Sequence, residues 1–239
     1  RQMCIRDSLV KERSPDAFRE AVEEEWRHLQ DGPGTLVQEE VDRVEARFRR
    51  PAYRHLPAID AAHEHRLNAD KAYSRWVARN VHAHRQDGYV AVTVSLKQHG
   101  LPPGDATADQ MDAVATLADR FSFGEVRVTH EQNLLLPHVE LRLLGELWGE
   151  LKALRLATPN IGLITNIIAC PGGDYCSLAN AVSIPVAEAI QERFADLDYI
   201  HDIGELDLNM SCCMNSCGHH HVGHIGILGV DKGGEEWYQ

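Results

Sequence analysis

The stretch YVAVTVSLKQHGLPPGDATADQMDAVATLADR (residues 89–120) contains a strand, a loop and a helix in that order. Residues 89–96 are rich in valine and other strand-forming residues and predict a β-strand. Residues 101–105 carry two prolines and a glycine, which predict a loop. Residues 107–120 have apolar side chains at helical spacing and predict an amphipathic helix. The side chains aligned on its inner face are Met111, Val114, Ala115 and Ala118.

The residues that follow extend this pattern. Two short strands are expected at 125–128 and 134–136, an amphipathic helix at 141–154 and an apolar strand at 163–168. The resulting order, β-α-β-β-α-β, is the ferredoxin-like split arrangement. We therefore predict an α+β protein with a ferredoxin-like half-domain at residues 71–160. Many unrelated functions use this fold, so the element order alone does not identify the function.

Residues 9–70 precede this half-domain and are predicted to be helices followed by a linker. Ser14 and Pro15 form a helix start, and Thr35 and Gln38 form a capping-box pattern for a second helix. Residues 52–70 are polar and irregular, which is typical of a linker. Residues 1–8 begin with arginine and lack a helical or strand period, so we expect a non-native leader there. Both ends of the chain are expected to be cut from a longer protein.

Composition narrows the class of protein. The chain has 239 residues and a formal net charge of −12, with its acidic residues spread along the sequence. This charge argues against a nucleic-acid partner, because phosphate binding needs clustered lysine and arginine. The longest apolar stretch, residues 161–170, is too short to span a bilayer. With no export signal at its start, the protein is expected to be cytoplasmic.

The cysteines carry most of the functional information. Six cysteines without an export signal indicate thiols or metal ligands rather than disulfides. Cys170 and Cys176 have five residues between them, and Cys213 and Cys217 have three. A strand is expected before each pair, at 163–168 and 206–210, and a helix at 177–194 is expected to begin just after the first pair. A helix start there would favour a thiolate through the helix dipole.

Four thiolates from two loops are what an iron–sulfur cube requires. Residues 161–239 are accordingly predicted to form a second, mixed αβ domain that binds the cluster. A structural zinc site is the first alternative, but paired zinc ligands usually have two to four residues between them, fewer than the first pair here. Buried, unreactive cysteines are the second alternative. The glycines that accompany each pair argue against it.

At these residues the sequence resembles the nitrite and sulfite reductase hemoprotein family. Its members share a Cys-x5-Cys pair followed by a Gly-Cys-x-Asn-x-Cys-Gly element. The corresponding segment here is CCMNSCG (212–218), followed by HHHVGHIG (219–226). Upstream, RVTHEQNL (127–134) resembles the family's Arg-x-Thr-x-x-Gln-Asn element. The likeness extends over roughly residues 14–239 and matches the end of the first half and most of the second half of such an enzyme.

The resemblance implies two cofactors. It implies a 4Fe–4S cluster held by Cys170, Cys176, Cys213 and Cys217. It also implies a siroheme whose iron is bridged to the cluster by Cys217, which would then be the catalytic ligand as well. The other residues implied to contact siroheme are Arg127, Gln132, Asn133 and Asn215. For Arg127 the alternative role is a structural ion pair. A cofactor role is supported by chemistry, because arginine pairs with carboxylates and siroheme carries many of them.

The implied activity is the six-electron reduction of sulfite to sulfide by an assimilatory sulfite reductase hemoprotein. Sulfite is preferred because the segment 217–226 is similar to that of bacterial sulfite-type members, and reduction of nitrite to ammonia is the alternative. The electron donor would be ferredoxin or a flavoprotein. A non-catalytic iron–sulfur electron-transfer module and a zinc-binding module are the other functional classes. In the family, the arginines and lysines that hold the anion come chiefly from the first half, so the fragment alone is expected to be inactive.

Two features depart from the family pattern or stay ambiguous. Cys212 stands where the family usually has glycine, and its thiol would compete with the predicted ligands. Cys213 is retained as the ligand because its spacing to Cys217 matches. The run His219–His221, with His224, would suggest metal binding by composition. Because Cys217 is already the implied axial ligand, packing and hydrogen bonding beside the cofactor are the preferred roles for these histidines.

Overall fold

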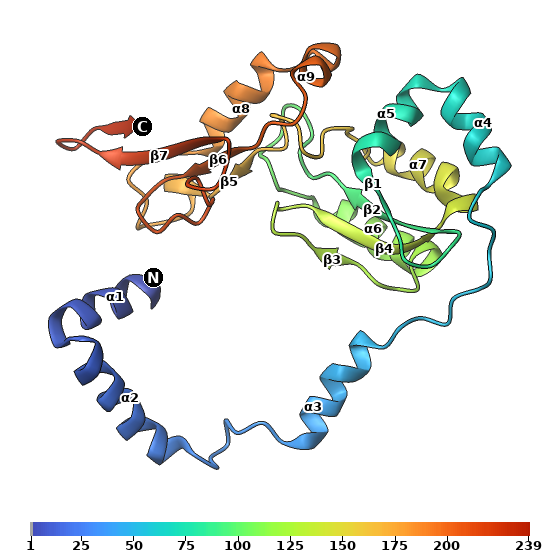
Figure 1. Cartoon of the computed structure of the whole chain (residues 1–239). Coiled ribbons are helices and arrows are strands. Elements are labelled where there is room, and N and C mark those ends of the chain that lie inside the picture. Colours follow the sequence, from blue (N-terminus) through green and yellow to red (C-terminus); the bar gives the residue numbers. More distant parts are fainter. Residues whose placement is uncertain (1) are drawn as a thin grey trace. The chain divides into compact units, whose positions relative to one another are not determined.

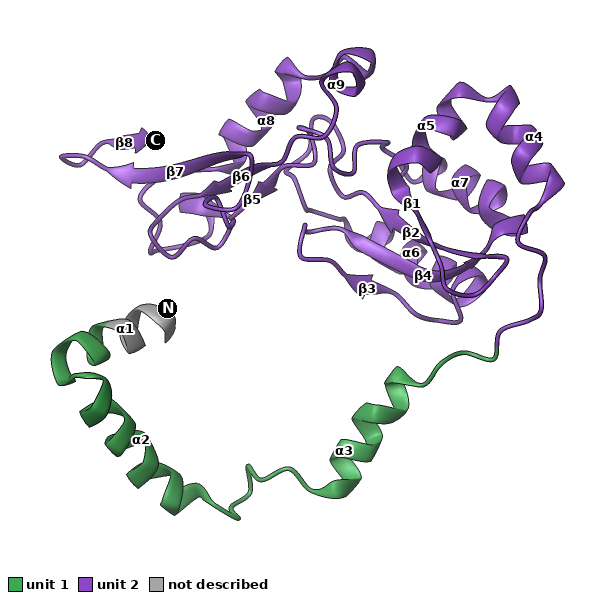
Figure 2. Cartoon of the chain, in the orientation of Figure 1, with its two compact units in different colours: residues 1–52 green, residues 53–239 purple. Residues whose placement is uncertain are grey.

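The computed structural model describes the backbone of residues 2–239 and the side chains of residues 8–239. Of the leader expected at residues 1–8, only the side chain of Ser8 is therefore described. The chain divides into two compact units, residues 1–52 and 53–239, which are coloured separately in Figure 2. The first unit is helical, whereas the second contains both sheets and all of the predicted site residues.

The first unit consists of α1 (Gln2–Arg13), α2 (Pro15–Leu29), α3 (Gln38–Glu45) and the 3₁₀ turn η1 (Ala46–Phe48). The predicted helix start at Ser14 is confirmed, since the Ser14 hydroxyl accepts a hydrogen bond from the Ala17 N–H at 3.4 Å and Pro15 follows. The predicted capping box at Thr35 is wrong. Helix α3 begins later, after Val37, and has no side-chain cap. Residues 2–13 form α1, although residues 1–8 carry no helical period in the sequence.

The second unit opens with two helices, α4 (Ala61–Ala69) and α5 (Lys71–Asn80). The sequence predicted an irregular linker at 52–70, which is wrong for α4. This helix has no buried residue, and so it has no apolar period from which it could be predicted. The residues before it also pack on the half-domain, because the Tyr53 ring contacts those of Tyr89 and His138.

A four-stranded antiparallel sheet forms the half-domain. Its strands are β1 (Val81–Ala83), β2 (Tyr89–Val94), β3 (Arg127–Val128) and β4 (Leu134–Glu140), in the spatial order β1-β2-β4-β3. Helices α6 (Ala108–Phe121) and α7 (Leu144–Ala153), the latter entered through η2 (Leu141–Leu143), pack on it around one apolar core (Figure 1). The predicted ferredoxin-like arrangement is confirmed, and Thr107 and Gln110 form a complete capping box at the start of α6.

One strand of the predicted arrangement belongs elsewhere. The apolar strand expected at 163–168 is only β5 (Ile168–Ala169), and it pairs in parallel with the second sheet. The edge of the half-domain is filled instead by β1, whose Val81 lies opposite Val92 of β2. Residues 161–166 form turns because polar side chains bond locally; for example, the Asn160 amide donates to the backbone oxygen of Thr165 at 3.4 Å.

The second sheet has the order β5-β6-β7-β8, with β6 (Leu208–Ser211), β7 (Ile225–Asp231) and β8 (Glu236–Tyr238). Strands β5, β6 and β7 are parallel, and β8 is antiparallel to β7. Helices α8 (Ile184–Arg193) and α9 (Leu197–Ile203) accompany this sheet in Figure 1. The strand predicted at 206–210 is confirmed as β6, and β7 follows the second cysteine loop.

The prediction of a helix immediately after Cys176 is wrong. The residues after Cys176 form turns, and α8 begins only at Ile184 with Pro185 in its first turn. Proline fits the first turn of a helix, so it starts this helix rather than bending a longer one. The first cysteine pair therefore has no helix dipole behind it, and it lies around the short 3₁₀ turn η3 (Gly172–Asp174).

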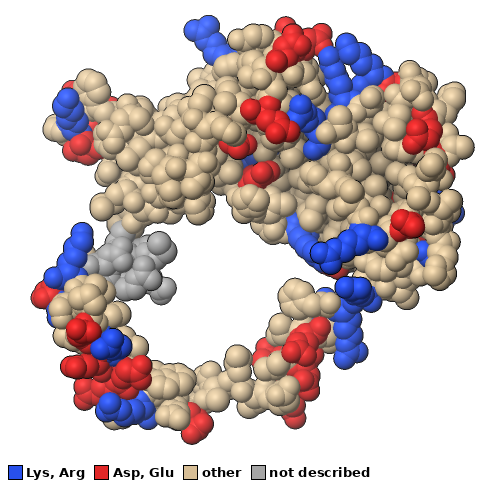
Figure 3. Space-filling model, in the orientation of Figure 1, with Lys and Arg blue, Asp and Glu red and all other residues tan. Residues whose placement is uncertain are grey.

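Within residues 2–239, no helix is long and apolar enough to cross a membrane. Basic and acidic side chains are interspersed over the visible face of the molecule in Figure 3. This matches the spread of charge that the sequence shows.

Candidate functional site

The two cysteine loops begin at the same edge of the second sheet. Strand β5 leads directly into Cys170, and β6 leads into Cys212 and Cys213. Because β5 and β6 are parallel, their carboxyl ends lie side by side. The Cys170 N–H donates to the Met210 carbonyl at 3.0 Å, which extends this pairing up to the first cysteine. The fold therefore brings loops that are about forty residues apart to a common place.

The four predicted ligands also interact electrostatically. Burial raises the pKa of the Cys217 thiol, and the charges of Cys213, Cys170 and Cys176 raise it further. Like charges act in this way only when they are near one another. Cys217 thus lies within electrostatic range of the other three predicted ligands, although it is itself exposed to solvent.

Among the residues that the structure describes, no group of three or more histidine, cysteine or acidic side chains is arranged to hold a metal ion. In an iron–sulfur cube each thiolate binds a different iron, so the four sulfur atoms stand farther apart than around one ion. Four thiols on two converging loops provide the donor set that such a cube takes.

Cys212 contacts the sulfur of Cys170. Its backbone N–H donates to the Cys170 sulfur at 3.1 Å, and its thiol hydrogen-bonds to the same sulfur. The Cys212 thiol and nearby backbone N–H groups lower the pKa of Cys170 to about 6, against the opposing effect of burial. The same contact, followed by burial, raises the pKa of Cys212. The structure therefore joins Cys170 to Cys212, the residue directly before the predicted ligand Cys213.

Two glycines allow the loops to fold this tightly. A Cβ atom at Gly218 would lie 1.8 Å from the Met210 carbonyl oxygen, a distance that no side chain tolerates. Gly172 has a φ of +62°, and its Cβ would lie 2.7 Å from the Ser183 hydroxyl and 3.1 Å from the Cys212 sulfur. Ser183 is wholly buried and donates a hydrogen bond to the Cys170 carbonyl oxygen. Both loops are held by backbone contacts that leave no room for larger residues.

Two of the residues predicted to contact siroheme, Arg127 and Gln132, lie in the half-domain rather than on the cysteine loops. Arg127 lies on β3, is about half exposed, and donates its Nε–H to Glu125 at 2.6 Å. This is the ion pair that was the alternative for this residue. Gln132 lies on the turn between β3 and β4 with a φ of +57°. Its side-chain amide donates to the Ala169 carbonyl at 2.7 Å and accepts from the Ala169 N–H at 3.1 Å, so it binds the strand that leads to Cys170.

Asn133 and Asn215 differ in burial. Asn133 has no exposed surface; its carbonyl accepts from the Leu96 N–H and its amide donates to Asn166, both at 3.0 Å. Asn133 holds the half-domain to the turn at residues 161–166, and its predicted cofactor contact stays a prediction. Asn215 is half-buried within the second cysteine loop, two residues before Cys217.

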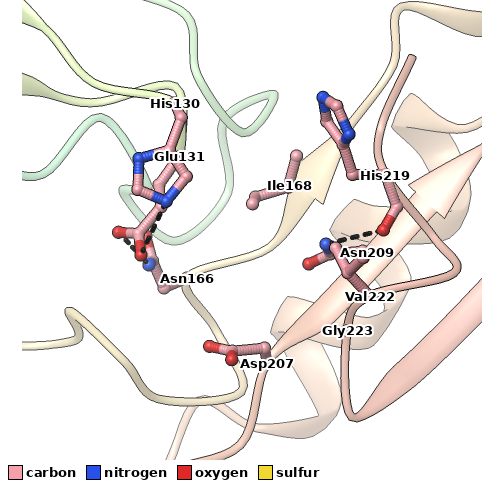
Figure 4. A pocket seen from close by; sticks show the side chains of 9 residues that line it. All are labelled: His130, Glu131, Asn166, Ile168, Asp207, Asn209, His219, Val222 and Gly223. Atoms are coloured by element: carbon pink, nitrogen blue, oxygen red, sulfur yellow. Dashed lines mark hydrogen bonds and ion pairs between the residues drawn. The ribbon is translucent and has the colours of Figure 1, made fainter. Parts of the chain in front are cut away.

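A cavity of about 260 Å³ lies between the turn that carries Gln132 and the loop that follows Cys217 (Figure 4). Its lining residues are His130, Glu131, Asn166, Ile168, Asp207, Asn209, His219, Val222 and Gly223. Asn209 is buried, and its side-chain oxygen Oδ1 has no hydrogen-bond partner. The cavity lies at the amino ends of β5 and β6, whereas the cysteines lie at their carboxyl ends.

The histidine run divides between two roles. His219 reaches this cavity, and its carbonyl oxygen accepts a hydrogen bond from the Asn209 amide at 3.1 Å. His224 lies 3.3 Å from the Asp207 carboxylate. The rings of His219 and His220 both pack beside that of His221. These contacts are of the packing and hydrogen-bonding kind that was preferred for the run.

One residue of this region was missed by the sequence analysis. Lys97 follows β2, is 1% exposed, and donates to the Gln132 side-chain oxygen at 3.2 Å. The only signal in the sequence is its position directly after the strand predicted at residues 89–96. Such a lysine normally lies in solvent, and so the pattern gave no reason to single it out.

Comparisons with known proteins agree with this architecture. The family model for the nitrite/sulfite reductase ferredoxin-like half domain matches residues 82–154, which run from β1 to just past α7. The solved structure of the Mycobacterium tuberculosis NirA protein is similar to 96% of this chain and 36% of its own, with a TM-score of 0.53 and 23% identity. At this identity the similarity shows the fold alone.

Sequence relatives extend the similarity beyond the half-domain. The chloroplastic ferredoxin–nitrite reductase of Betula pendula is 32% identical over 166 residues, which are 67% of this chain and 26% of that protein. That of Synechococcus elongatus is 31% identical over 63% of this chain and 28% of its own. The assimilatory-type sulfite reductase of Nitratidesulfovibrio vulgaris is 25% identical over 55% of this chain and 59% of its own. The chain thus spans about a quarter of the length of the plant relatives that it matches.

Proposed function

Because the chain belongs to the nitrite and sulfite reductase family, we propose that it is part of an enzyme that reduces sulfite to sulfide at a siroheme coupled to a 4Fe–4S cluster. The observation that supports this most strongly is the convergence of two cysteine loops at the carboxyl ends of β5 and β6. The electrostatic influence of three cysteines on Cys217 supports the same grouping.

In this proposal Cys170, Cys176, Cys213 and Cys217 hold the cluster, and Cys217 also binds the siroheme iron. The two cofactors would supply the one-electron steps that a six-electron reduction needs. The protein supplies ligation and charge around them. Arg127 would turn from Glu125 toward a siroheme carboxylate, which its exposure allows, and Asn215 would contact the cofactor from the second cysteine loop.

The substrate is the finer part of the proposal. Similarity of the segment 217–226 to sulfite-type members favours sulfite. Reduction of nitrite to ammonia is the second candidate, and it is favoured by the higher identity to ferredoxin–nitrite reductases, 32% and 31%, than to the sulfite reductase, 25%. Steady-state kinetics of the full-length protein with each anion separate the two, since the true substrate gives the larger kcat/KM.

The proposal includes an electron donor and a compartment. Ferredoxin is the donor in the names of the nitrite reductases that resemble this chain, and a flavoprotein is the alternative. We place the reaction in the cytoplasm, where cysteines stay reduced; the described cysteines are free thiols. Since the arginines and lysines that hold the anion are expected from the other half of the enzyme, the chain alone should not reduce either anion.

The decisive experiment measures iron content and the visible spectrum of the full-length protein, with Cys217→Ser and Ser216→Ala compared. We expect siroheme bands and iron in the unmodified protein and in Ser216→Ala, whose hydroxyl only contacts the Met214 carbonyl at 3.4 Å. Cys217→Ser should lose the coupled spectrum. Iron without siroheme bands would indicate an electron-transfer module instead, and zinc without iron would indicate a structural metal site.

A further inference from the structure

Lys97 is an unusual lysine. Its side chain is 1% exposed, and burying an ammonium group costs free energy unless the charge is compensated. Its Nζ donates to the Gln132 side-chain oxygen at 3.2 Å. The acidic groups that act on it are Glu131, next to Gln132, and Asp105, in the loop that covers it. Lys97 is therefore held by polar contacts inside the protein rather than by solvent.

The partner of Lys97 is itself fixed on both sides. The Gln132 oxygen accepts from Lys97 and from the Ala169 N–H at 3.1 Å, while its amide donates to the Ala169 carbonyl at 2.7 Å. Gly104, with a φ of +95°, lets the covering loop approach: its Cβ would lie 3.1 Å from that of Gln132 and 3.5 Å from the Lys97 nitrogen. Each hydrogen-bonding atom of the Gln132 side chain is therefore used within this contact.

The contact between Lys97 and Gln132 is linked to Cys170 through Ala169. Ala169 belongs to β5, which has two residues and is the edge strand of its sheet. One side of β5 pairs with β6, and the Gln132 amide binds the other side as an additional strand would. Cys170 follows immediately, and its N–H bonds to Met210 of β6. The position of Cys170 thus depends on two sets of bonds, one from each side of a very short strand.

We propose that Lys97 is a positioning residue for Cys170, which it acts on through Gln132 and the outer edge of β5. This inference rests on the proposed function only where it takes Cys170 as a cluster ligand. The local order that Lys97 imposes on residues 168–170 is a separate consequence. When it carries its proton, Lys97 has a further effect, because reduction adds a negative charge to a cluster and a buried cation favours the reduced form.

The test compares Lys97→Met with Lys152→Met in the full-length protein. Methionine has a similar length but neither charge nor donor, and Lys152 is an exposed lysine whose nitrogen lies over the Trp148 ring. The first readout is amide hydrogen exchange of the peptide that contains Ala169 and Cys170. We expect exchange to become about tenfold faster in Lys97→Met and to stay unchanged in Lys152→Met.

The second readout is the cluster. Lys97→Met should lower the iron content after anaerobic reconstitution and shift the reduction potential of the remaining cluster to a lower value, whereas Lys152→Met should change neither. A third variant, Gln132→Met, should give the same exchange rate as the Lys97→Met and Gln132→Met double variant, because both act through one contact. Additive effects would overturn the proposed route.

The two proposals can fail separately. If the unmodified protein binds iron and siroheme but Lys97→Met matches it in exchange, iron content and potential, the positioning role of Lys97 is refuted while the proposed function stands. If the unmodified protein binds no cluster, the proposed function fails, and so does the role of Lys97 toward a cluster ligand. Circular dichroism of each variant identifies any that has lost its fold, and in that case the milder variant Gln132→Glu replaces it.

Discussion

The backbone N–H of Cys212 donates a hydrogen bond to the sulfur of Cys170 at 3.1 Å. Because the two residues follow neighbouring parallel strands, this bond ties the second cysteine loop to the first. The Cys212 thiol makes another hydrogen bond to the same sulfur. Only the thiol contact depends on the side chain, so the two contributions can be separated by substitution.

Replacement of Cys212 by glycine should retain or improve cluster content. The backbone N–H survives in Cys212→Gly, while the thiol that competes for Cys170 and lies near Gly172 is removed. Iron and acid-labile sulfide per chain in the full-length protein measure the outcome. The matched variant Cys213→Gly should lose the cluster. The reverse pattern, with loss only in Cys212→Gly, would make Cys212 the ligand in place of Cys213.

Gly218→Ala should be strongly destabilising. The new Cβ would lie 1.8 Å from the Met210 carbonyl oxygen, which is backbone and has little room to move. We expect a loss of about 3 kcal/mol in the free energy of unfolding. Gly149→Ala is the matched control, because nothing lies within 4 Å of its Cβ in the exposed face of α7. Alanine should stabilise that helix by about 0.5–1 kcal/mol. Equal urea midpoints for the two variants would contradict the close packing at Gly218.

The ferredoxin-like elements could be predicted because their periodicity is local. Helices α6 and α7 each have an apolar face, and Thr107 with Gln110 marks the start of one of them. Sheet membership could not be predicted in the same way. Strand β1 has three residues and β5 has two, so neither carries a pattern, and their places depend on pairing with distant strands. Helix α4 escaped prediction because none of its residues is buried.

The site was only partly visible in the sequence. The spacing of Cys170, Cys176, Cys213 and Cys217 pointed to two loops, and the parallel strands do deliver the loops to one edge. Contacts between side chains were not visible. Glu125 as the partner of Arg127, and Leu96 as the partner of Asn133, depend on how two strands and a turn meet in space. The spacing of residues in the sequence does not predict such side-chain contacts, since they arise from tertiary packing.

Arg127→Ala should lower siroheme content with little effect on the stability of the cofactor-free protein. In the structure Arg127 pairs with Glu125, but its side chain is 54% exposed, and surface ion pairs contribute about 0–1 kcal/mol. A siroheme carboxylate would gain more from the same guanidinium. Siroheme per chain and the urea midpoint of the cofactor-free protein are the two measurements. A large fall in stability with normal siroheme content would establish the structural ion pair as the role of Arg127.

Lys97 makes the stability of the protein depend on pH in a predictable direction. Burial lowers the pKa of Lys97 to about 7, although Glu131 and then Asp105 act to raise it, whereas an unfolded lysine has a pKa of about 10.4. Between these values the unfolded chain binds more protons than the folded one. The contribution of Lys97 to the free energy of unfolding therefore rises with pH from about 7 to about 10 and is constant below that window.

The size of this contribution is on the order of a few kcal/mol, since each pKa unit corresponds to about 1.4 kcal/mol. Urea unfolding of the unmodified protein, Lys97→Met and Lys152→Met across the window isolates it. The curve for Lys97→Met should lack the rise, because methionine does not titrate. The Lys152→Met curve should run parallel to that of the unmodified protein, because Lys152 is exposed. Parallel curves for all three proteins would mean that Lys97 reaches solvent, and the ammonium could not then hold Gln132 against β5 in the way that the buried geometry requires.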